Sequence, residues 1–238
     1  MGRIATRAGA PVLFLCLAFA HTSYAGTIED NFNDNSLNTS IWGTWVFNYG
    51  SVSEVNQRIE EVVPNHSGWA EAGLAMLSLV GGDFDVRVDV AVLDFSGQSG
   101  GSITYGGGPV EICGHSLDVG LGGGGYYARF CDGTYNVPSS DTSGTLRLTR
   151  SGSTYSGYFW DGSNWQLIHS SPGGPTGDYG VSMSSHSADG SSGVAYDNFY
   201  LQTGPLTSEV PEPGTLLLGV SGVLLGGLIA RAFRRRNR

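Results

Sequence analysis

Short stretches in which apolar and polar residues alternate run through the middle of the chain. The clearest covers residues 84–93, where every second position is apolar: Phe84, Val86, Val88, Val90 and Val92. Asp85, Arg87 and Asp89 lie between them. Side chains of a strand point alternately to its two faces, so this period of two predicts a strand with one core face and one solvated face.

Similar stretches recur between residues 26 and 203, separated by turn residues. The other predicted strands are 51–63, 74–78, 108–113, 126–131, 146–149, 154–160, 165–169, 181–184 and 194–201. The tetrapeptides 150–153 and 161–164 have the composition of hairpin turns. No segment of this region keeps a helical period over three turns. We therefore predict one all-β domain at 26–203, a two-sheet antiparallel sandwich of about ten to twelve strands.

Composition agrees with this prediction. Glycine accounts for 38 of the 238 residues and charged residues for only 14%. Glycine at this level disfavours a helical bundle, since each helical glycine costs about 1 kcal/mol relative to alanine. All 12 basic residues are arginine, and only five lie between Glu29 and Glu209, against 20 acidic residues. This negative field argues against nucleic-acid partners and suits cations and neutral sugars.

The first 25 residues resemble a secretory signal peptide. Arg3 and Arg7 precede an apolar run at 8–20, and small residues lead to a predicted cleavage after Ala25. The apolar run is too short to span a bilayer. We therefore expect signal peptidase to remove residues 1–25.

The C-terminus carries a second apolar run. Residues 214–230 have no charge and are long enough for a short transmembrane helix, and residues 231–238 form a basic tail. Positive charge stays on the cytoplasmic side, so the domain is expected to face outward from the inner membrane. Residues 204–213 form a linker that ends in Pro211, Glu212 and Pro213.

This order of a Pro-Glu-Pro tripeptide, an apolar helix and a terminal arginine cluster resembles the PEP-CTERM sorting signal. The resemblance implies recognition by exosortase, a membrane-embedded cysteine transpeptidase-like enzyme of bacteria that make exopolysaccharide. It also implies removal of the helix, with the domain reaching the cell surface or the extracellular matrix. The alternative is a plain membrane anchor in which the prolines only end the helix.

Several short motifs of the domain resemble the concanavalin A-like lectin and glucanase superfamily. They include Asp30-Asn31-Phe32 near the start, residues 82–86 in the middle and residues 196–199 at the end. The resemblance implies a jelly roll in which the first and last strands are neighbours, which would bring Asp30 near Asp197.

Cys113 and Cys131 are the cysteines that remain after signal removal. An even pair in an exported protein predicts a disulfide, with two free thiols as the alternative.

The segment 30–35 is rich in Asp and Asn, the oxygen ligands that Ca²⁺ uses. With Asp197 adjacent in the implied fold, Asp30, Asp34 and Asp197 are candidate ligands of a structural calcium ion. A polar turn in which these side chains bond their own backbone is the alternative.

The sequence offers no recognisable catalytic residues. Glu60 and Glu61 are neighbours and would face opposite sides of a strand, whereas glycosidases need two carboxyls close together. Aromatic residues are abundant, and flat rings beside Asn, Asp and Gly suit sugar binding. Trp160, Trp165, Tyr126 and Tyr127 are the candidate stacking residues.

These features favour a non-catalytic carbohydrate-binding protein of the envelope or exopolysaccharide matrix. A glycan-active hydrolase or lyase with an atypical site, and a purely structural surface or adhesion protein, are the alternatives.

Overall fold

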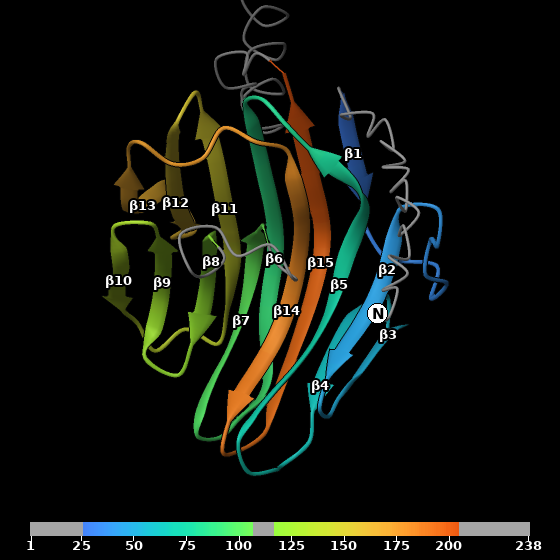
Figure 1. Ribbon diagram of the computed structural model, residues 1–238. Coiled ribbons are helices and arrows are strands. Elements are labelled where there is room, and N and C mark those ends of the chain that lie inside the picture. Colours follow the sequence, from blue (N-terminus) through green and yellow to red (C-terminus); the bar gives the residue numbers. More distant parts are fainter. Residues whose placement is uncertain (1–25, 107–116, 205–238) are drawn as a thin grey trace, which may run out of the picture.

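The computed structural model describes residues 26–106 and 117–204, which form an antiparallel β-sandwich (Figure 1). Sheet A has the order β13 (Trp165–Ser171), β12 (Thr154–Trp160), β11 (Ser143–Ser151), β6 (Phe84–Phe95), β15 (Ser192–Thr203), β4 (Arg58–Val63) and β3 (Ser51–Val55), with β1 (Thr27–Asp30) also paired to β15. Sheet B has the order β10 (Gly133–Pro138), β9 (Gly125–Phe130), β8 (Leu117–Gly122), β7 (Gln98–Tyr105), β14 (Tyr179–Ala188), β5 (Trp69–Val80) and β2 (Trp42–Phe47). The predicted all-β sandwich is confirmed.

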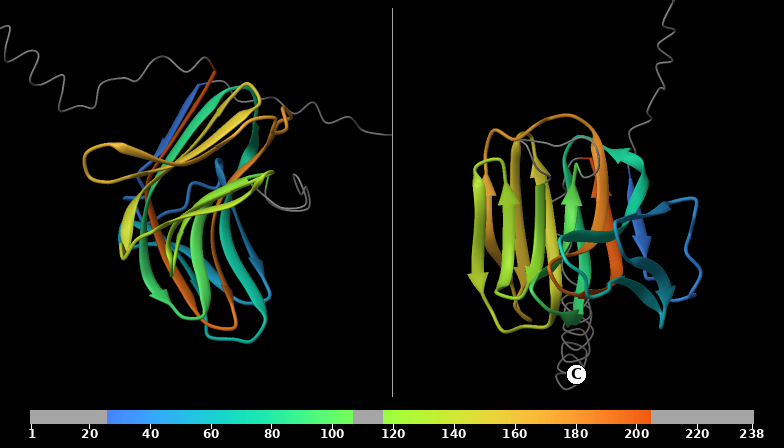
Figure 2. Two further views of the ribbon diagram at one scale, coloured as in Figure 1. Left: turned by 90° about the vertical axis from the view of Figure 1, so that its left-hand side faces the viewer. Right: turned by 60° about the horizontal axis from the view of Figure 1, so that its bottom comes forward.

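The hydrophobic core lies between the two sheets, which Figure 2 shows as two layers. On β6, Phe84, Val86, Val88 and Val90 are at most 2% exposed and belong to the main core cluster. The partner sheet contributes alternate residues of its strands in the same way, such as Leu117, Val119 and Leu121 of β8. The residues between them therefore form two outer faces, one on each sheet.

The predicted strand 51–63 is two strands joined by a tight turn. Asn56 and Gln57 have φ values of 55° and 60°, and a two-residue hairpin turn with both central residues at positive φ matches the twist of its strands. β3 and β4 then pair with Val55 opposite Arg58. The predicted turns at 150–153 and 161–164 do join β11 to β12 and β12 to β13.

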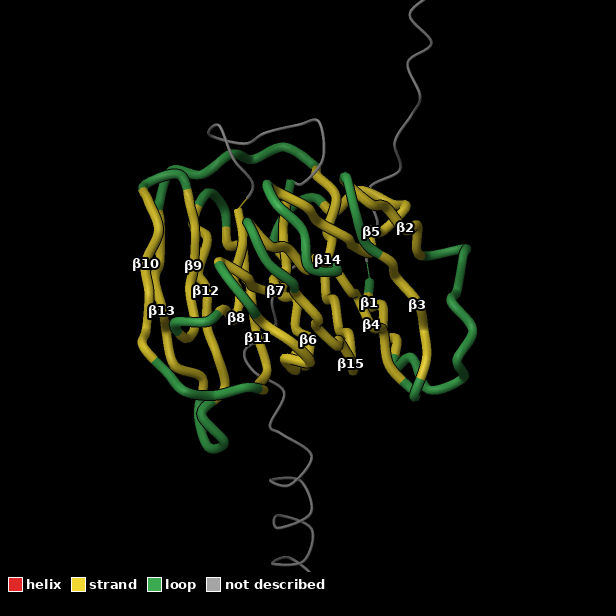
Figure 3. The backbone as a smooth tube through the Cα atoms, turned by 90° about the horizontal axis from the view of Figure 1, so that it is seen from below, coloured by secondary structure: helices red, strands yellow, loops and turns green. Residues whose placement is uncertain are grey.

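The sequence analysis missed five strands, namely β1, β2, β7, β8 and β10. Glycine contributes to this result: Gly120 and Gly122 lie within β8, where Leu117, Val119 and Leu121 alternate as core residues. The described residues contain strands and connecting loops and no helix (Figure 3).

The two ends of the domain meet. The N–H of Gly26 donates to Thr203 Oγ1 at 2.9 Å, and the N–H of Thr203 donates to the Gly26 carbonyl, also at 2.9 Å. β1 and β15 are neighbours, as the jelly-roll resemblance implied. The predicted signal cleavage site and the predicted linker therefore leave the domain at one place.

Several predictions fall on residues outside the described ranges. These are the signal peptide, the strand at 108–113, the linker after residue 204 with its Pro211-Glu212-Pro213 motif, the transmembrane helix at 214–230 and the basic tail. Within the described ranges, no helix has the length and hydropathy needed to cross a bilayer. Cys131 follows β9 and is disulfide-bonded, but Cys113 lies outside the described residues, so the Cys113–Cys131 pairing stays a prediction.

Candidate functional site

The outer face of sheet B, called here the sheet B face, has a central row of small residues. Pairing registers place Gly73, Ser184, Ser102 and Gly120 side by side on β5, β14, β7 and β8. We call these four the small-residue row. Trp45 of β2 continues the row at one end, and Tyr127 of β9 continues it at the other. Trp45 lies over Gly73 and Tyr127 lies over Gly120, and Ser184 and Ser102 are each 2% exposed, so the row is covered.

The aromatic side chains of this face lie over glycines. A methyl group placed on Gly73 would meet the Trp45 indole at 2.7 Å, and one on Gly120 would collide with the Tyr127 ring. A methyl group on Gly100 would lie 3.0 Å from His186 Cε1. Glycine is therefore required wherever a ring lies flat along the sheet, which accounts for part of the high glycine content.

An exposed stacked pair marks one end of the face. Trp69 and His186 have ring centroids 5.0 Å apart and an interplanar angle of 17°. Trp69 is 45% exposed although it begins a central strand. Burial, with a smaller effect of Arg129, lowers the pKa of His186 to about 4. The histidine is therefore neutral at pH 7, and the pair offers an uncharged ring surface to solvent.

Charged groups lie directly beside this pair. Glu71 is the cross-strand neighbour of His186. Burial raises the pKa of Glu71, while hydrogen bonds from Ser184 and Trp69 side chains oppose that shift. Asp118 and Arg129 lie on the other side of the small-residue row from this pair. Arg129 donates two hydrogen bonds to Asp118, at 2.9 and 2.8 Å. The ion pair cancels its own charge, so the face carries no surplus positive charge.

One hydroxyl of the face lacks a partner. The Tyr127 hydroxyl is buried and has no hydrogen bond of normal geometry. Burial raises the pKa of this phenol far above its usual value, so it is a neutral donor and acceptor at pH 7. Such a group costs free energy unless a partner serves it, and a ligand hydroxyl would do so.

The predicted stacking residues separate into three places. Tyr127 lies on the sheet B face. Trp160 and Trp165 contact each other on sheet A, with centroids 5.3 Å apart and an angle of 64°. Tyr126 is a correction: it is 1% exposed and stacks on Phe159 at 4.2 Å in the core. Neighbours in a strand point to opposite faces, so only one of Tyr126 and Tyr127 could face solvent.

Sequence reasoning missed Trp69, Glu71, His186, Asp118 and Arg129 as members of one site. They come from β5, β14, β8 and β9, and only the strand order and register bring them together. The alternating glycines at 120 and 122 were a usable signal, because strand glycines mark a close approach.

Of the three candidate calcium ligands, Asp30 and Asp34 line the same hollow, and Asp197 is not among its lining residues. Asp30 pairs with Phe199, whereas Asp197 pairs with Asp89. Asp30 accepts hydrogen bonds from the Phe32 N–H at 3.1 Å and from Trp42 Nε1 at 2.8 Å. Asp30 therefore lies two positions from Asp197 along neighbouring strands, and the grouping of these two carboxylates as calcium ligands stays a prediction.

Asp34 instead lies near Glu54. The Ser36 N–H donates to both carboxylates, at 3.0 Å to Asp34 and 3.1 Å to Glu54. Burial and the neighbouring Asp34 raise the pKa of Glu54. Within residues 26–106 and 117–204, no group of three or more His, Cys, Asp or Glu side chains is arranged to hold a metal ion. The residues as placed do not form the predicted calcium site.

Comparison with solved structures identifies the class of fold as a concanavalin A-like, legume-lectin-like β-sandwich. The chain is similar to the VIP36 exoplasmic/lumenal domain bound to Ca²⁺ and Man3GlcNAc, with a TM-score of 0.53 and 15% identity over 72% of this chain and 89% of that one. It is also similar to the Emp47p carbohydrate recognition domain, with a TM-score of 0.51 and 13% identity over 75% of this chain and 95% of that one.

A third similar structure is a sialidase, with a TM-score of 0.51 and 8% identity; the match covers 78% of this chain and 19% of the sialidase. Identities of this size show the fold. No protein-family model and no curated protein matches the chain.

Proposed function

We propose that this chain is an exported, non-catalytic carbohydrate-binding β-sandwich that binds neutral, hydroxyl-rich sugars on the sheet B face. The observation that carries the proposal is Trp69, an exposed indole stacked on neutral His186 with the Glu71 carboxyl beside it. Apolar ring faces with a few fixed polar groups are the usual composition of small-ligand sites.

Each part of the face has a role in this proposal. Trp69 stacks on the apolar face of a sugar ring, and Glu71 accepts hydrogen bonds from its hydroxyls. The Tyr127 ring, which lies over Gly120, would extend the apolar surface along the sheet. Because Asp118 and Arg129 neutralise each other, the face favours neutral sugars over acidic ones. The fold shared with a domain solved with Man3GlcNAc and with a carbohydrate recognition domain supports this proposal.

The test is binding of neutral oligosaccharides to the purified chain by glycan array and calorimetry. Trp69→Ala is expected to weaken binding by about tenfold or more, since stacking of an aromatic ring contributes on the order of 1.4 kcal/mol. The matched control is Leu77→Ala, which removes another exposed apolar side chain of β5, 62% exposed, and should leave affinity unchanged. Equal affinity of Trp69→Ala and the parent chain would exclude this site.

A glycan-active hydrolase or lyase is the second candidate. The raised pKa of Glu71 favours it, since a carboxyl group whose pKa is raised by burial could move a proton. Release of reducing ends or of unsaturated sugars from glycans that bind, and its loss in Glu71→Gln, would establish it. A purely structural surface protein is the conclusion if no glycan binds at all.

The export route is part of the same proposal. Signal peptidase would cleave after Ala25, and exosortase would act near Pro211, Glu212 and Pro213, delivering the domain to the cell surface or exopolysaccharide matrix. Mass spectrometry of the protein from cells with and without exosortase tests it. A released form that lacks residues 214–238 supports the route, and a full-length membrane-bound form contradicts it.

A structural calcium ion in the segment around Asp30 and Asp34 stays a prediction. Thermal unfolding with Ca²⁺ and with a chelator tests it. A rise in Tm with Ca²⁺ that is lost in Asp34→Asn supports the ion, and an unchanged Tm contradicts it.

A further inference from the structure

β3 and β4 form a hairpin at one edge of sheet A (Figure 3). We call residues 51–63 the edge hairpin. Within the sheet, β4 pairs with β15. Across the sandwich, β3 and β4 pack on β5, and β4 also packs on β14. The side chains on the inner face of the edge hairpin therefore decide how firmly it is held against sheet B.

Two of these inner-face side chains carry carboxyl groups. Register places Val52 opposite Glu61 and Glu54 opposite Ile59, and cross-strand partners lie on the same face of a sheet. Glu61 is fully buried, and Glu54 is 8% exposed. Acidic residues are almost never fully buried unless they are paired, so the surroundings of both carboxyls bear on the stability of the edge hairpin.

The apolar contacts of the edge hairpin are limited. Ile59 belongs to the main core cluster, whereas Val63 forms a small separate cluster with Ala70 and Ala72. Alanine side chains bury little apolar area, so this cluster contributes less than the Val and Phe side chains that β6 places in the main core. The edge hairpin is therefore a part of the domain that can open at a lower cost than β6.

Glu61 has no partner that compensates for its burial. Neither of its carboxyl oxygens has a hydrogen bond of normal geometry. Burial raises the pKa of Glu61 well above its ordinary value, Glu71 adds to the rise, and the backbone of Leu74 and Ser185 offsets only part of it. A charged carboxylate at this position is therefore far more costly than a neutral carboxyl group.

The groups that face Glu61 from the neighbouring strands carry no positive charge at pH 7. Tyr196 of β15 is a neutral phenol, because burial raises its pKa and Glu61 adds to the rise. Glu71 of β5 and His186 of β14 lie on the outer side of sheet B, and the pKa of His186 is about 4. An ionised Glu61 would thus have an acidic neighbour and no cation across the sandwich.

The charged groups of the edge hairpin itself do not help either. Burial and the neighbouring Asp34 raise the pKa of Glu54, the other inner-face carboxyl. Arg58 lies on the outer face of β4, where it donates a hydrogen bond to Glu60 at 2.7 Å. The edge hairpin therefore buries two acidic groups on one side while its arginine is engaged on the other.

The edge hairpin also holds part of the segment before β2. Glu54 accepts a hydrogen bond from the Ser36 N–H at 3.1 Å. The N–H of Gln57, in the turn of the hairpin, donates to Asn35 Oδ1 at 2.9 Å. A movement of the edge hairpin would therefore release residues 35 and 36 as well.

We propose that Glu61 makes the edge hairpin a pH-sensitive flap, docked on sheet B while the Glu61 carboxyl is neutral and opened when that carboxyl ionises. Opening brings the carboxylate into water and removes the cost of burying a charge. In the open state the carboxyl has the ordinary pKa of 4.5, whereas in the docked state its pKa is higher. The docked state therefore loses stability as the pH rises above about 4.5.

The test is hydrogen exchange of the full chain in detergent, followed by mass spectrometry at pH 4 and pH 8. Peptides within 51–63 report on the edge hairpin, and peptides within 84–95 report on β6. At pH 8, protection factors of the parent chain should be at least about tenfold lower in 51–63 than in 84–95, because the edge hairpin opens without unfolding of the domain.

Glu61→Gln keeps the size of the side chain but cannot ionise. Its protection of residues 51–63, relative to the parent chain, should rise by about tenfold or more between pH 4 and pH 8, the change that one pKa unit gives. Peptides that contain residues 35 and 36 should follow the same trend. If Glu61→Gln does not fold, Glu61→Leu replaces it with the same expected result, since leucine is apolar and of similar size.

The matched control is Glu60→Gln, the neighbouring residue on the outer face of β4. Hydrogen bonds from Asn56 and Arg58 lower the pKa of Glu60, so its charged form stabilises the folded chain. Protection of residues 51–63 in Glu60→Gln, relative to the parent chain, should therefore stay the same or fall between pH 4 and pH 8. The two variants thus change in opposite directions with pH.

Three results would overturn the proposal. The first is a ratio of protection between Glu61→Gln and the parent chain that is the same at pH 4 and pH 8, because ionisation of Glu61 would then not drive opening. The second is equal protection of residues 51–63 and 84–95, because the domain would then open only as a whole. The third is a rise in Glu60→Gln as large as that in Glu61→Gln, which would assign the effect to surface charge.

Discussion

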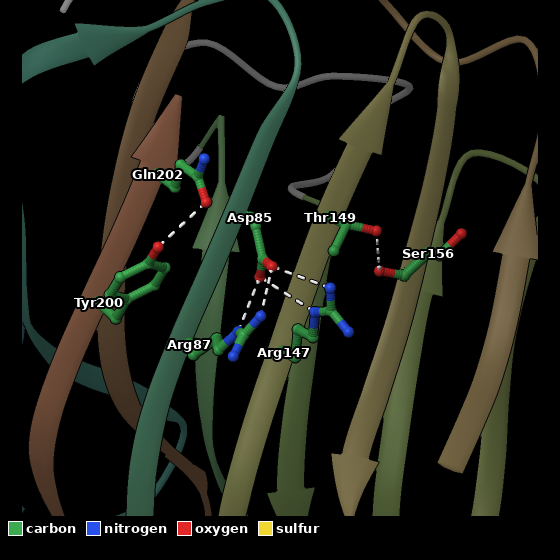
Figure 4. Close-up of polar contacts among 7 residues, drawn as sticks. All are labelled: Asp85, Arg87, Arg147, Thr149, Ser156, Tyr200 and Gln202. Carbon is green, nitrogen blue, oxygen red and sulfur yellow. Dashed lines mark hydrogen bonds and ion pairs between the residues drawn. The ribbon is translucent and has the colours of Figure 1, made fainter. Parts of the chain in front are cut away.

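The two outer faces of this sandwich have similar backbones, but different kinds of side chain lie at their centres. The centre of the sheet B face is Gly73, Ser184, Ser102 and Gly120, with aromatic rings lying flat at the ends. The centre of the sheet A face is a row of large side chains, called here the arginine row: Tyr158, Arg147, Arg87 and Tyr200. Its two guanidinium groups contact aromatic rings and share the Asp85 carboxylate (Figure 4). Aromatic side chains lie on both faces. On the sheet B face they cover glycines, and on the sheet A face they cover arginines.

The difference shows how a sheet sets the charge of its surface. On the sheet B face Asp118 pairs with Arg129, and the ring of His186 is held neutral. On the sheet A face Arg87 and Arg147 share the Asp85 carboxylate. The first face therefore has a one-to-one ion pair, and the second has a carboxylate shared between two cations.

Asp85→Asn is expected to have the largest effect on stability. It leaves two guanidinium groups adjacent and without their carboxylate, so we expect the free energy of unfolding to fall by about 3–5 kcal/mol. Asp118→Asn on the other face should cost less, about 2 kcal/mol, because Arg129 is 38% exposed and can turn to water. Urea unfolding of both variants measures the contrast; equal losses would show that the two ion pairs are equivalent.

Acidification should act through His186 on the sheet B face. Its pKa in the folded protein is about 4, below the value of about 6.5 expected in the unfolded chain. The unfolded state therefore binds a proton first, and the free energy of unfolding falls as pH decreases from about 6.5 to about 4, by up to about 3 kcal/mol.

Arg129 also disfavours the charged form of this histidine, while Glu71 gives a contribution of opposite sign because its pKa is raised. The measurement is thus the difference in unfolding free energy between the parent chain and His186→Gln, followed from pH 7.5 to 4. A difference that does not change with pH would contradict the lowered pKa.

Gly120→Ala tests the small-residue row. The added methyl group would collide with the Tyr127 ring and the Gly101 carbonyl, and overpacking of this kind costs about 2 kcal/mol. Gly123→Ala in the following turn is the matched control, since nothing lies within 4 Å of the added carbon. Thermal unfolding compares the two. The arginine row contains no glycine, so no equivalent substitution exists on sheet A.

The sequence was sufficient to predict the sandwich but not its two faces. The alternation on β6 assigned Phe84, Val86 and Val88 to the core, where they are. It also placed Glu60 and Glu61 on opposite faces of their strand. Glu61 is fully buried, whereas Glu60 accepts a hydrogen bond from Arg58 on the outer face. Strands with a clear period of two are therefore predictable from local pattern alone.

The faces depend on register between strands that are far apart in the sequence. Arg87 meets Arg147 and Tyr200 only because β6 lies between β11 and β15. Nothing local in the sequence indicates that pairing, so Trp160 and Trp165 were interpreted as a sugar-binding pair without the arginines that Trp165 contacts. Glycine had a further effect, since Gly120 and Gly122 weaken the strand pattern of β8, which the sequence analysis did not predict.

The smallest expected effect is a difference in unfolding free energy between two tryptophan variants. One tryptophan contacts cations, and the other stacks on a neutral partner. Trp165 contacts the guanidinium groups of Arg87 and Arg147, whereas Trp69 stacks on a neutral histidine and is 45% exposed. Trp165→Leu should lower the free energy of unfolding by about 1 kcal/mol, and Trp69→Leu by about half as much, because cation–π attraction adds to the lost contact area. Urea unfolding in 0.05 and 0.5 M NaCl measures both. The loss in Trp165→Leu should depend on salt and the loss in Trp69→Leu should not. Equal losses without salt dependence in either variant would show that the rings stabilise both faces through contact area alone.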